Sequence, residues 1–348
     1  MIEMLKAAVL GATGNVGQIF VQLLNAHPWF MVSVVAASER STGLTYSEAS
    51  RWRQTTPIPE GVADMEVVDL EPKAVEDADI VFSALPADVA RQAEEDFAAA
   101  GYVVVSNASA HRMDRDVPLL NPEVNCSHVS LIKEQRRRRE WDGAIVANPN
   151  CSVSVLTLPL KPIYDEFGIN RVVVSTMQAV SGAGYPGVAY LDIVDNIVPF
   201  IGREEKKLET ETLKILGSPS EPADLSISAS CHRVPTLDGH MEAVFTELGC
   251  KAEPESVVTA MRDFVGEPQR LKLPTAPEKP VIIKCEEDRP QTRLDRMEGN
   301  GMSVVVGRVR EDSVLGGVKF VVLGHNTIRG AAGCGLLNAE YLKAKNYI

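Results

Sequence analysis

The sequence predicts an α/β protein of two domains, the first with a doubly wound parallel sheet and the second an α+β domain with a mixed, largely antiparallel sheet. Three observations indicate this. Short strands that are apolar throughout alternate with helical segments in the first 150 residues. The glycine-rich segment GATGNVG, residues 11–17, lies between the first strand and the first helix. Beyond Cys151 the strand-like segments become more numerous, and several alternate apolar with polar residues.

The first half of the chain consists of successive strand–helix–strand units. Its strands are apolar throughout, which is typical of parallel sheets covered on both faces. Apolar residues recur at helical spacing from Val16 to Leu24. A second helix is expected from Asp88 to Ala100, with Gly101 placed to end it. The expected strands are Ala7–Leu10, Met31–Ala37, Asp79–Leu85, Tyr102–Val105 and Ala144–Ala147.

The second half predicts a different sheet. A charged helix is expected within residues 202–216, and a closing helix follows Gly330. We therefore expect a first domain at residues 1–150, a second at 151–327, and a C-terminal helix at 328–348 that returns to the first. The expected strands of the second sheet are Arg171–Val180, Leu225–Cys231, Glu242–Leu248, Val281–Cys285, Ser303–Arg310 and Val318–Leu323.

The glycine-rich segment predicts a dinucleotide site of the Rossmann type. Gly11 allows a tight turn, Gly14 lets the backbone approach a phosphate, and Gly17 lets helix and strand pack closely. The start of the following helix supplies N–H groups and a positive dipole end to a pyrophosphate. The spacing is GxxGxxG instead of GxGxxG, so the strand–loop–helix context carries much of the prediction.

The end of the second strand favours NADP over NAD. NAD sites place an acidic residue there to bind the ribose 2′-hydroxyl. Ser38 occupies that place in this chain, and Arg40 and Ser41 could hold a 2′-phosphate. Glu39 is ambiguous, because a carboxylate pointing inward would favour NAD.

Cys151 is a candidate nucleophile, in the segment NPNCSVSVL of residues 148–156. Asn150 is a good N-cap, and a cysteine in the first helical turn has its thiolate stabilised by the helix dipole. Pro159 and Pro162 predict that this helix is kinked or short. The alternative is a buried structural thiol.

A thiolate nucleophile also needs a proton-transfer group and an anion site. Arg233 and His240 lie seven positions apart in RVPTLDGH, in a loop flanked by strands. Arginine can clamp a carboxylate, and histidine ordinarily titrates near neutral pH. For His240 alone, a surface or turn histidine is the competing interpretation.

Composition excludes several classes. The net charge of −12 argues against a general nucleic-acid-binding protein. The basic run 136–139 is interpreted as a solvated face or loop. No apolar run of membrane-spanning length and no signal peptide is recognised, and the six scattered cysteines suit a reducing cytoplasm. Cys231 and His232 lack partners at zinc spacing, so no metal site is expected.

Six segments together resemble the aspartate-β-semialdehyde dehydrogenase family, in its archaeal and fungal branch. They are GATGNVG, SNAS, NPNCS, EExK, RVPxxxGH and GHNTIRGAAG, in that order from Gly11 to about Gly333. The resemblance implies a glyceraldehyde-3-phosphate dehydrogenase-like fold and a cytoplasmic homodimer or homotetramer. It also implies NADPH-dependent reduction of L-aspartyl-4-phosphate to aspartate semialdehyde and phosphate, in the biosynthesis of lysine, methionine, threonine and isoleucine.

The resemblance also implies a role for each matching residue. Cys151 would be the nucleophile, His240 the acid/base, and Gln178 would lie beside the thioester. Arg233 would hold the substrate carboxylate and Glu204 its amino group, with Glu205 as an alternative alignment. The phosphate ligands would be Lys207, Arg112 and Asn107. The NADP contacts would be Thr13, Gly14, Asn15, Val16, Ser38, Arg40, Ser83 and Asn326.

Three alternatives remain at this stage. A reductase of CoA thioesters that forms malonate semialdehyde would share the fold and the thiol chemistry. An N-acetyl-glutamyl-phosphate reductase would usually carry a PGCY-like cysteine context, whereas this chain has PNCS. A non-catalytic NADP-sensing protein would be expected to have lost Cys151 or His240, and both are present.

Overall fold

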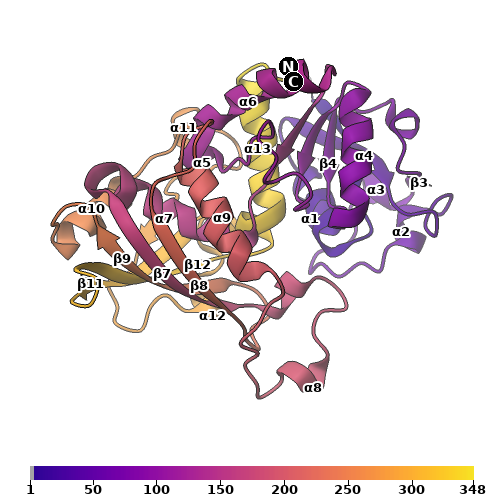
Figure 1. The fold of residues 1–348 in the computed structure, drawn as a ribbon. Helices are drawn as coiled ribbons and strands as arrows, with labels where there is room; N and C mark the ends of the chain where they lie inside the picture. The colour runs from indigo at the N-terminus through magenta and orange to yellow at the C-terminus, as the bar shows by residue number, and fades with distance from the viewer. Residues whose placement is uncertain (1–3) are drawn as a thin grey trace. The chain divides into compact units, whose positions relative to one another are not determined.

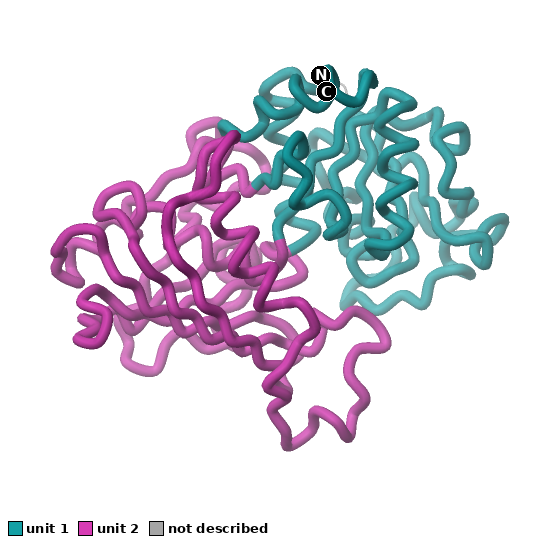
Figure 2. The backbone as a smooth tube through the Cα atoms, in the orientation of Figure 1, with its two compact units in different colours: residues 1–120, 127–149, 331–348 teal, residues 121–126, 150–330 magenta. Residues whose placement is uncertain are grey.

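A computed structural model describes residues 4–348, which form two compact units (Figure 2). The first unit comprises residues 1–120, 127–149 and 331–348, and the second comprises residues 121–126 and 150–330. The sequence places the domain boundaries after residues 150 and 327. Those domain limits remain a prediction, since the units are defined by packing alone.

The first unit is built on a six-stranded sheet of order β3-β2-β1-β4-β5-β6, with every pairing parallel (Figure 1). This is the Rossmann order, in which the chain reverses direction across the sheet between β1 and β4. The predicted doubly wound sheet is confirmed. Its strands are β1 (Leu5–Leu10), β2 (Phe30–Ala36), β3 (Val67–Val68), β4 (Ile80–Ser83), β5 (Val103–Ser106) and β6 (Ala144–Ala147).

Helices complete this unit. The strands β4, β5 and β6 are buried along their whole length, as their apolar sequences predict. Helix α1 packs against β1 and β2, α4 against β5 and β6, and α13 against β5 and α1. The helices are α1 (Asn15–Leu24), α2 (Tyr46–Ala49), α3 (Glu60–Ala63), α4 (Ala87–Ala99), α6 (Leu131–Arg139) and α13 (Gly333–Ala344), with 3₁₀ turns at Pro72–Val75 and Cys126–Ser130.

The second unit is built on a mixed six-stranded sheet of order β10-β11-β12-β9-β7-β8 (Figure 1). Three of its pairings are antiparallel, while β10–β11 and β7–β8 are parallel, so the predicted mixed sheet is confirmed. Its strands are β7 (Ile169–Gln178), β8 (Ser226–Arg233), β9 (His240–Leu248), β10 (Val281–Ile283), β11 (Val304–Asp312) and β12 (Gly317–Gly324).

Helices α7 and α9 position the residues of interest in this unit. Helix α7 packs against β9, β12 and β11, and α9 packs against α7 and β8. Alternate residues of β9, starting at His240, are buried. The helices are α5 (Pro122–Asn125), α7 (Cys151–Phe167), α8 (Tyr190–Ile193), α9 (Glu204–Leu216), α10 (Pro254–Asp263), α11 (Glu267–Arg270) and α12 (Thr292–Asp295), with 3₁₀ turns at Val180–Ala183 and Glu298–Gly301 and a π-helical turn at Ile328–Ala332.

Two local expectations need correction. Helix α7 continues through Pro159 and Pro162 for 17 residues, so of the two alternatives, kinked or short, the short helix is wrong and the kink stays a prediction. Its buried side chains extend from the first turn to Ile163, and this packing outweighs the two missing backbone hydrogen bonds. The strands β8 and β9 also extend further than predicted. Arg233 is therefore the last residue of one strand and His240 the first of the next.

One buried cation ties the short segment 121–126 to the rest of the second unit. Arg329 is fully buried and donates from Nη2 to Asn121 Oδ1 at 2.7 Å. The same nitrogen forms an ion pair with Glu123, which is itself buried. A buried guanidinium requires such partners, and they lie about two hundred positions earlier in the chain.

Within residues 4–348, no helix combines the length and the hydropathy that crossing a bilayer requires.

The glycine-rich segment forms the turn between β1 and α1. Gly11 has a φ of +72°, which favours glycine, and a Cβ there would lie 2.8 Å from Ala84 O. A Cβ at Gly17 would lie 2.2 Å from Gly11 O and 2.7 Å from Ala12 Cα. The helix can therefore approach the turn this closely only with glycine at position 17.

We expect Gly17→Ala to lower the free energy of unfolding by about 1–3 kcal/mol, because the added methyl group must displace backbone atoms. Urea denaturation at neutral pH measures this. The matched control is Gly61→Ala in the short helix α3, where a Cβ meets nothing within 4 Å. Equal stability of the two variants would contradict the packing argument.

Candidate active site

The start of α1 can accept a pyrophosphate. Gly14 is the N-cap and provides no side chain to cap the first-turn N–H groups. Those N–H groups lie at the carboxyl end of β1, next to the point where strand order reverses. The residues of this turn therefore fit a dinucleotide, as the sequence predicts.

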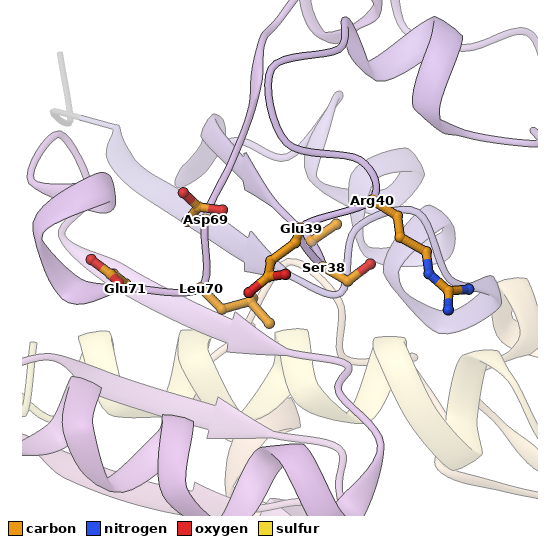
Figure 3. Close-up of a pocket in the computed structure, with 7 residues that line it drawn as sticks. Ser38, Glu39, Arg40, Asp69, Leu70 and Glu71 are labelled. Atoms are coloured by element: carbon orange, nitrogen blue, oxygen red, sulfur yellow. The ribbon is translucent and has the colours of Figure 1, made fainter.

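A pocket lies at the end of β2 and is lined mainly by charged side chains (Figure 3). It is lined by Ser38, Glu39 and Arg40 from one loop and by Asp69 and Glu71 from another, with Ala37 and Leu70. In Figure 3 the carboxylate of Glu39 lies beside Leu70, whereas Arg40 extends on the far side of Ser38. Arg40 is the only cation among these lining residues. It is therefore the residue whose charge would bind a 2′-phosphate.

Cys151 is the first residue of α7, and its position is set by Asn150. The Asn150 Oδ1 atom accepts from the N–H groups of Ser152 at 3.0 Å and of Val153 at 3.3 Å, forming an N-cap. Gly330 packs against the cysteine, since a Cβ there would lie 2.7 Å from Cys151 Cβ. The half-buried thiol therefore lies at the positive end of a long helix.

Asn150 also joins α7 to α9. Its Nδ2 atom donates to Glu204 Oε1 at 2.7 Å, and its backbone N–H donates to Glu211 Oε2 at 2.7 Å. Lys207 lies 3.3 Å from the other Glu204 oxygen. Glu205 instead accepts from the Cys231 N–H at 3.1 Å. The structure thus places Glu204, and not Glu205, beside the residue that caps the cysteine helix.

Arg233 and His240 are both held by the backbone of one residue, Ala179. Arg233 Nη1 donates to Ala179 O at 2.7 Å, and the Ala179 N–H donates to His240 Nδ1 at 3.1 Å. A Cβ at Gly182 would lie 2.9 Å from Arg233 Nη1 and 3.0 Å from His240 Cε1, so only glycine fits there. Burial lowers the pKa of Arg233, and the charges of Cys151 and Glu204 oppose that shift.

His240 is fully buried and neutral. Burial, together with the positive charge of Arg233, lowers its pKa to about 3, so it does not titrate near neutral pH as its residue type predicts. Because Nδ1 accepts from Ala179, the proton of the neutral ring is on Nε2. Within the described part of the chain, Nε2 is buried without a hydrogen-bond partner. His240 therefore presents a donor N–H.

Glu242 is a buried acid that the sequence did not suggest. It lies two residues beyond His240 on the same face of β9, fully buried, and neither carboxyl oxygen has a hydrogen-bond partner among residues 4–348. Burial, reinforced by the charge of Glu204, raises its pKa well above the usual value. Burial therefore favours the neutral, protonated form of Glu242.

The other predicted site residues are distributed over both units. Gln178 is buried at the end of β7, where Nε2 donates to Thr176 Oγ1 at 3.2 Å. Asn326, in the second unit, bridges the Gly239 N–H and Ser181 Oγ, both at 2.8 Å. Asn326 thus holds the turn before His240, and its predicted cofactor contact stays a prediction.

Three predicted residues lie at the strand ends of the first unit. The Ser83 hydroxyl donates to Glu94 Oε1 at 2.6 Å, so this side chain anchors α4. Arg112 is buried and donates from Nη2 to Asn107 O at 2.9 Å. Their predicted roles in ligand binding stay predictions. No group of three His, Cys, Asp or Glu side chains that could hold a metal ion is found in residues 4–348.

A Rossmann unit joined to a unit with a helix-capped cysteine, a neutral histidine and an arginine defines a dehydrogenase that can form a thioester. Residues 6–132 match the family described as semialdehyde dehydrogenase, NAD binding domain, and residues 160–329 match semialdehyde dehydrogenase, dimerisation domain. The chain belongs to the aspartate-semialdehyde dehydrogenase family.

The relatives support that assignment. The aspartate-semialdehyde dehydrogenase of Methanothermobacter thermautotrophicus is 57% identical, over 97% of this chain and 99% of that protein. The malonyl CoA reductase (NADP) of Metallosphaera sedula is 45% identical, over 100% and 99% of the two chains. The crystal structure of the Candida albicans aspartate semialdehyde dehydrogenase with NADP has a TM-score of 0.92 at 43% identity, covering 99% of this chain and 100% of that chain.

Sequence reasoning missed Glu211 and Glu242. Both side chains are buried, and no local pattern indicates which neighbours they have. For Glu242 the period-2 alternation of β9 was an available signal, because it puts this acidic residue on the apolar face.

We expect Glu242→Gln to be more stable than the wild type at pH 8, by about 1–3 kcal/mol, with the difference vanishing near pH 4.5. The unfolded chain releases the Glu242 proton above its usual pKa while the folded chain retains it, so wild-type stability falls as pH rises. Denaturation at pH 4.5, 6 and 8 measures this.

Glu247→Gln is the matched control on the same strand. Glu247 pairs with Arg171, and that bond lowers its pKa, so its replacement should give no gain that grows with pH. The contrary result is a Glu242→Gln variant whose stability relative to the wild type is the same at every pH, or is not increased at all. Either result would show that Glu242 is ionised in the folded protein.

Proposed function

We propose that the chain reduces L-aspartyl-4-phosphate to L-aspartate-4-semialdehyde through a thioester on Cys151, with NADPH as reductant. The observation that carries this is the position of Cys151 at the capped start of α7, in the field of Arg233. Its relatives give the substrate class, including a Vibrio cholerae aspartate semialdehyde dehydrogenase II structure complexed with ASA, at 28% identity and TM-score 0.78 over 99% of this chain and 100% of that chain.

The first step is acyl transfer to sulfur. The Cys151 thiolate attacks the acyl carbon, the C–S bond forms, and phosphate leaves with the electron pair of the C–O bond. The N–H groups at the start of α7 and the Arg233 guanidinium stabilise the thiolate. A neutral His240 is suited to this step, because it leaves Arg233 as the charge partner of the sulfur.

The second step is reduction of the thioester, for which bound NADPH supplies the hydride. Negative charge then develops on the former carbonyl oxygen. The Nε2–H of His240 is a buried donor that can stabilise this oxygen by a hydrogen bond without giving up its proton. The C–S bond breaks, the electron pair returns to Cys151, and the aldehyde leaves.

Substrate recognition follows from charge. Arg233 would bind the α-carboxylate, and Glu204 would bind the amino group, because its carboxylate is buried beside Asn150. Lys207, Asn107 and Arg112 would bind the phosphate, and Gln178 would lie beside the thioester. The support for these roles is the family motif together with the burial of Arg112 and Glu204.

The cofactor is NADP, held by the first unit. The turn at residues 11–17 would take the pyrophosphate, and Ser38 and Arg40 the 2′-phosphate. The NADP-bound Candida albicans structure supports this choice.

A reductase of malonyl-CoA is the second candidate, favoured by the 45% identity with the Metallosphaera sedula enzyme over the whole chain. It would use the same thiol and the same reductant. The two functions differ in the acyl donor, and malonate lacks the amino group that Glu204 would bind.

The chain carries the family's dimerisation domain, so it forms an oligomer. We propose a homodimer or homotetramer of a cytoplasmic enzyme. Exposed apolar side chains between β7 and α9, among them Tyr190, Leu191 and Phe200, support self-association. The six cysteines are thiols, which is typical of a reducing compartment.

We expect the wild type to oxidise aspartate semialdehyde with NADP and phosphate, and Cys151→Ser to lose about 1,000-fold or more of kcat, because the hydroxyl is a far weaker nucleophile. Cys285→Ser, at an exposed cysteine, is the control and should keep wild-type rates. Oxidation of malonate semialdehyde with CoA, together with no phosphate-dependent oxidation of aspartate semialdehyde, would establish the malonyl-CoA reductase alternative. Full activity of Cys151→Ser would rule out the thioester.

We expect Arg40→Ala to raise the KM for NADPH about tenfold and to leave the KM for NADH unchanged, because only NADPH carries the 2′-phosphate. Glu39→Gln should lower the KM for NADPH, since it removes a negative charge from the same pocket. Steady-state kinetics with both cofactors measures this. A parallel change for NADH in Arg40→Ala would mean that Arg40 supports the fold and not the phosphate.

A further inference from the structure

We propose that Arg139, at the end of α6, is a positioning residue that holds the loop carrying Asn107 and Arg112 in the conformation that binds the substrate phosphate. The proposal rests on the proposed function, since it takes Asn107 and Arg112 as phosphate ligands. The sequence singled out the basic run 136–139 only as a solvated face or loop. That interpretation holds for the exposed Arg137 and Arg138, but it is wrong for Arg139.

The loop between β5 and α5 needs such support. Residues 107–118 contain no helix or strand, so few backbone hydrogen bonds define their path. Yet the loop is packed: His111 is fully buried, and Arg112 is 6% exposed. The Arg112 bond to Asn107 O closes the loop on itself at 2.9 Å. Side-chain contacts must therefore fix the remaining conformation.

Arg139 supplies those contacts through two aspartates of the loop. Its Nε atom donates to Asp116 Oδ2 at 2.7 Å and its Nη2 atom to Asp116 Oδ1 at 3.0 Å, a two-pronged bond of fixed geometry. Nη2 also donates to Asp114 Oδ2 at 3.0 Å. Arg139 thus binds both Asp114 and Asp116, in the segment that follows Arg112.

Asp114 also contacts His111, the residue that precedes Arg112, and so links it to Arg139. Its Oδ2 atom lies 2.9 Å from His111 Nδ1, while His111 Nε2 lies 3.1 Å from Arg91 O. Burial alone would raise the pKa of Asp114, but the bonds from His111 and Arg139 lower it to about 2. Asp114 therefore remains a carboxylate, and the chain of contacts from Arg139 to His111 persists across the working pH range.

Arg139 also reaches a second helix. Its Nη1 atom donates to Glu95 Oε1 on α4 at 2.9 Å, and its guanidinium carbon lies 5.2 Å from the centre of the Trp141 ring. The side chain is 20% exposed, and Asp116 is 7% exposed, so these bonds are partly withdrawn from water. By contrast, Arg137 donates to Glu134 on its own helix and is 73% exposed.

The test is Arg139→Met, which keeps an unbranched side chain as far as the position of Nε and removes the guanidinium with its five donors. In phosphate-dependent oxidation of the semialdehyde by the full-length enzyme, we expect the KM for phosphate to rise about tenfold, because the ligands shift from their productive geometry. The KM values for semialdehyde and NADP should stay within about twofold. Arg137→Met is the matched control and should leave all three constants unchanged.

Arg139→Lys is a second variant, which keeps the charge but not the two-pronged bond, and should raise the KM for phosphate by a smaller factor. It keeps the question answerable if Arg139→Met does not fold. A KM for phosphate unchanged in the folded variants, or an equal rise in all three KM values, would overturn the proposal.

Arg112→Met separates this proposal from the proposed function. A raised phosphate KM in Arg112→Met together with an unchanged one in the Arg139 variants rejects only the positioning role of Arg139. An unchanged phosphate KM in Arg112→Met rejects the phosphate role of Arg112, and the positioning proposal falls with it.

Discussion

The hydrogen bonds of Asn150 are the constraint on which the second unit depends. One side-chain oxygen caps the helix that begins with Cys151, and the amide nitrogen of the same side chain holds Glu204. The backbone N–H of Asn150 is held by Glu211. A single residue therefore fixes the sulfur at the positive end of α7 and, with it, the carboxylate expected to recognise the substrate amino group. Both acids are buried, and without the Asn150 side chain Glu204 would lose a compensating donor.

Burial determines the charge states of the side chains around the Cys151 sulfur. His240 and Glu242 are both fully buried, and burial favours the neutral form of each, since it lowers the pKa of the histidine to about 3 and raises that of the glutamate. Besides the Arg233 cation, the site has the Glu204 carboxylate with Lys207 3.3 Å from it, and Glu211 on the Asn150 N–H. Arg233 and Glu204 are of opposite sign, which is the pattern that an amino-acid backbone complements. Neutral His240 contributes a donor and no net charge.

The relatives of this chain include enzymes named for two different reactions. Enzymes named as aspartate-semialdehyde dehydrogenase and as malonyl CoA reductase align with nearly the whole chain, so fold and thiol chemistry alone do not select the acyl donor. The two donors differ in the leaving group as well as in the amino group. The loop from Asn107 to Asp116 matters for that reason, because it carries Arg112 and is fixed by bonds from outside itself.

The sequence alone determined the features that are encoded within a few neighbouring residues. Apolar strands, the turn at residues 11–17 and the cap before Cys151 depend on local periodicity and backbone preference, and the structure has all three. The tertiary structure decided which acid lies beside Asn150, the charge state of Glu242 and the partners of Arg139. Each of these depends on solvation and on contacts between distant residues, such as the 54 positions that separate Asn150 from Glu204. No local pattern records which distant side chains will exclude water from a charge, and so only the folded chain determines it.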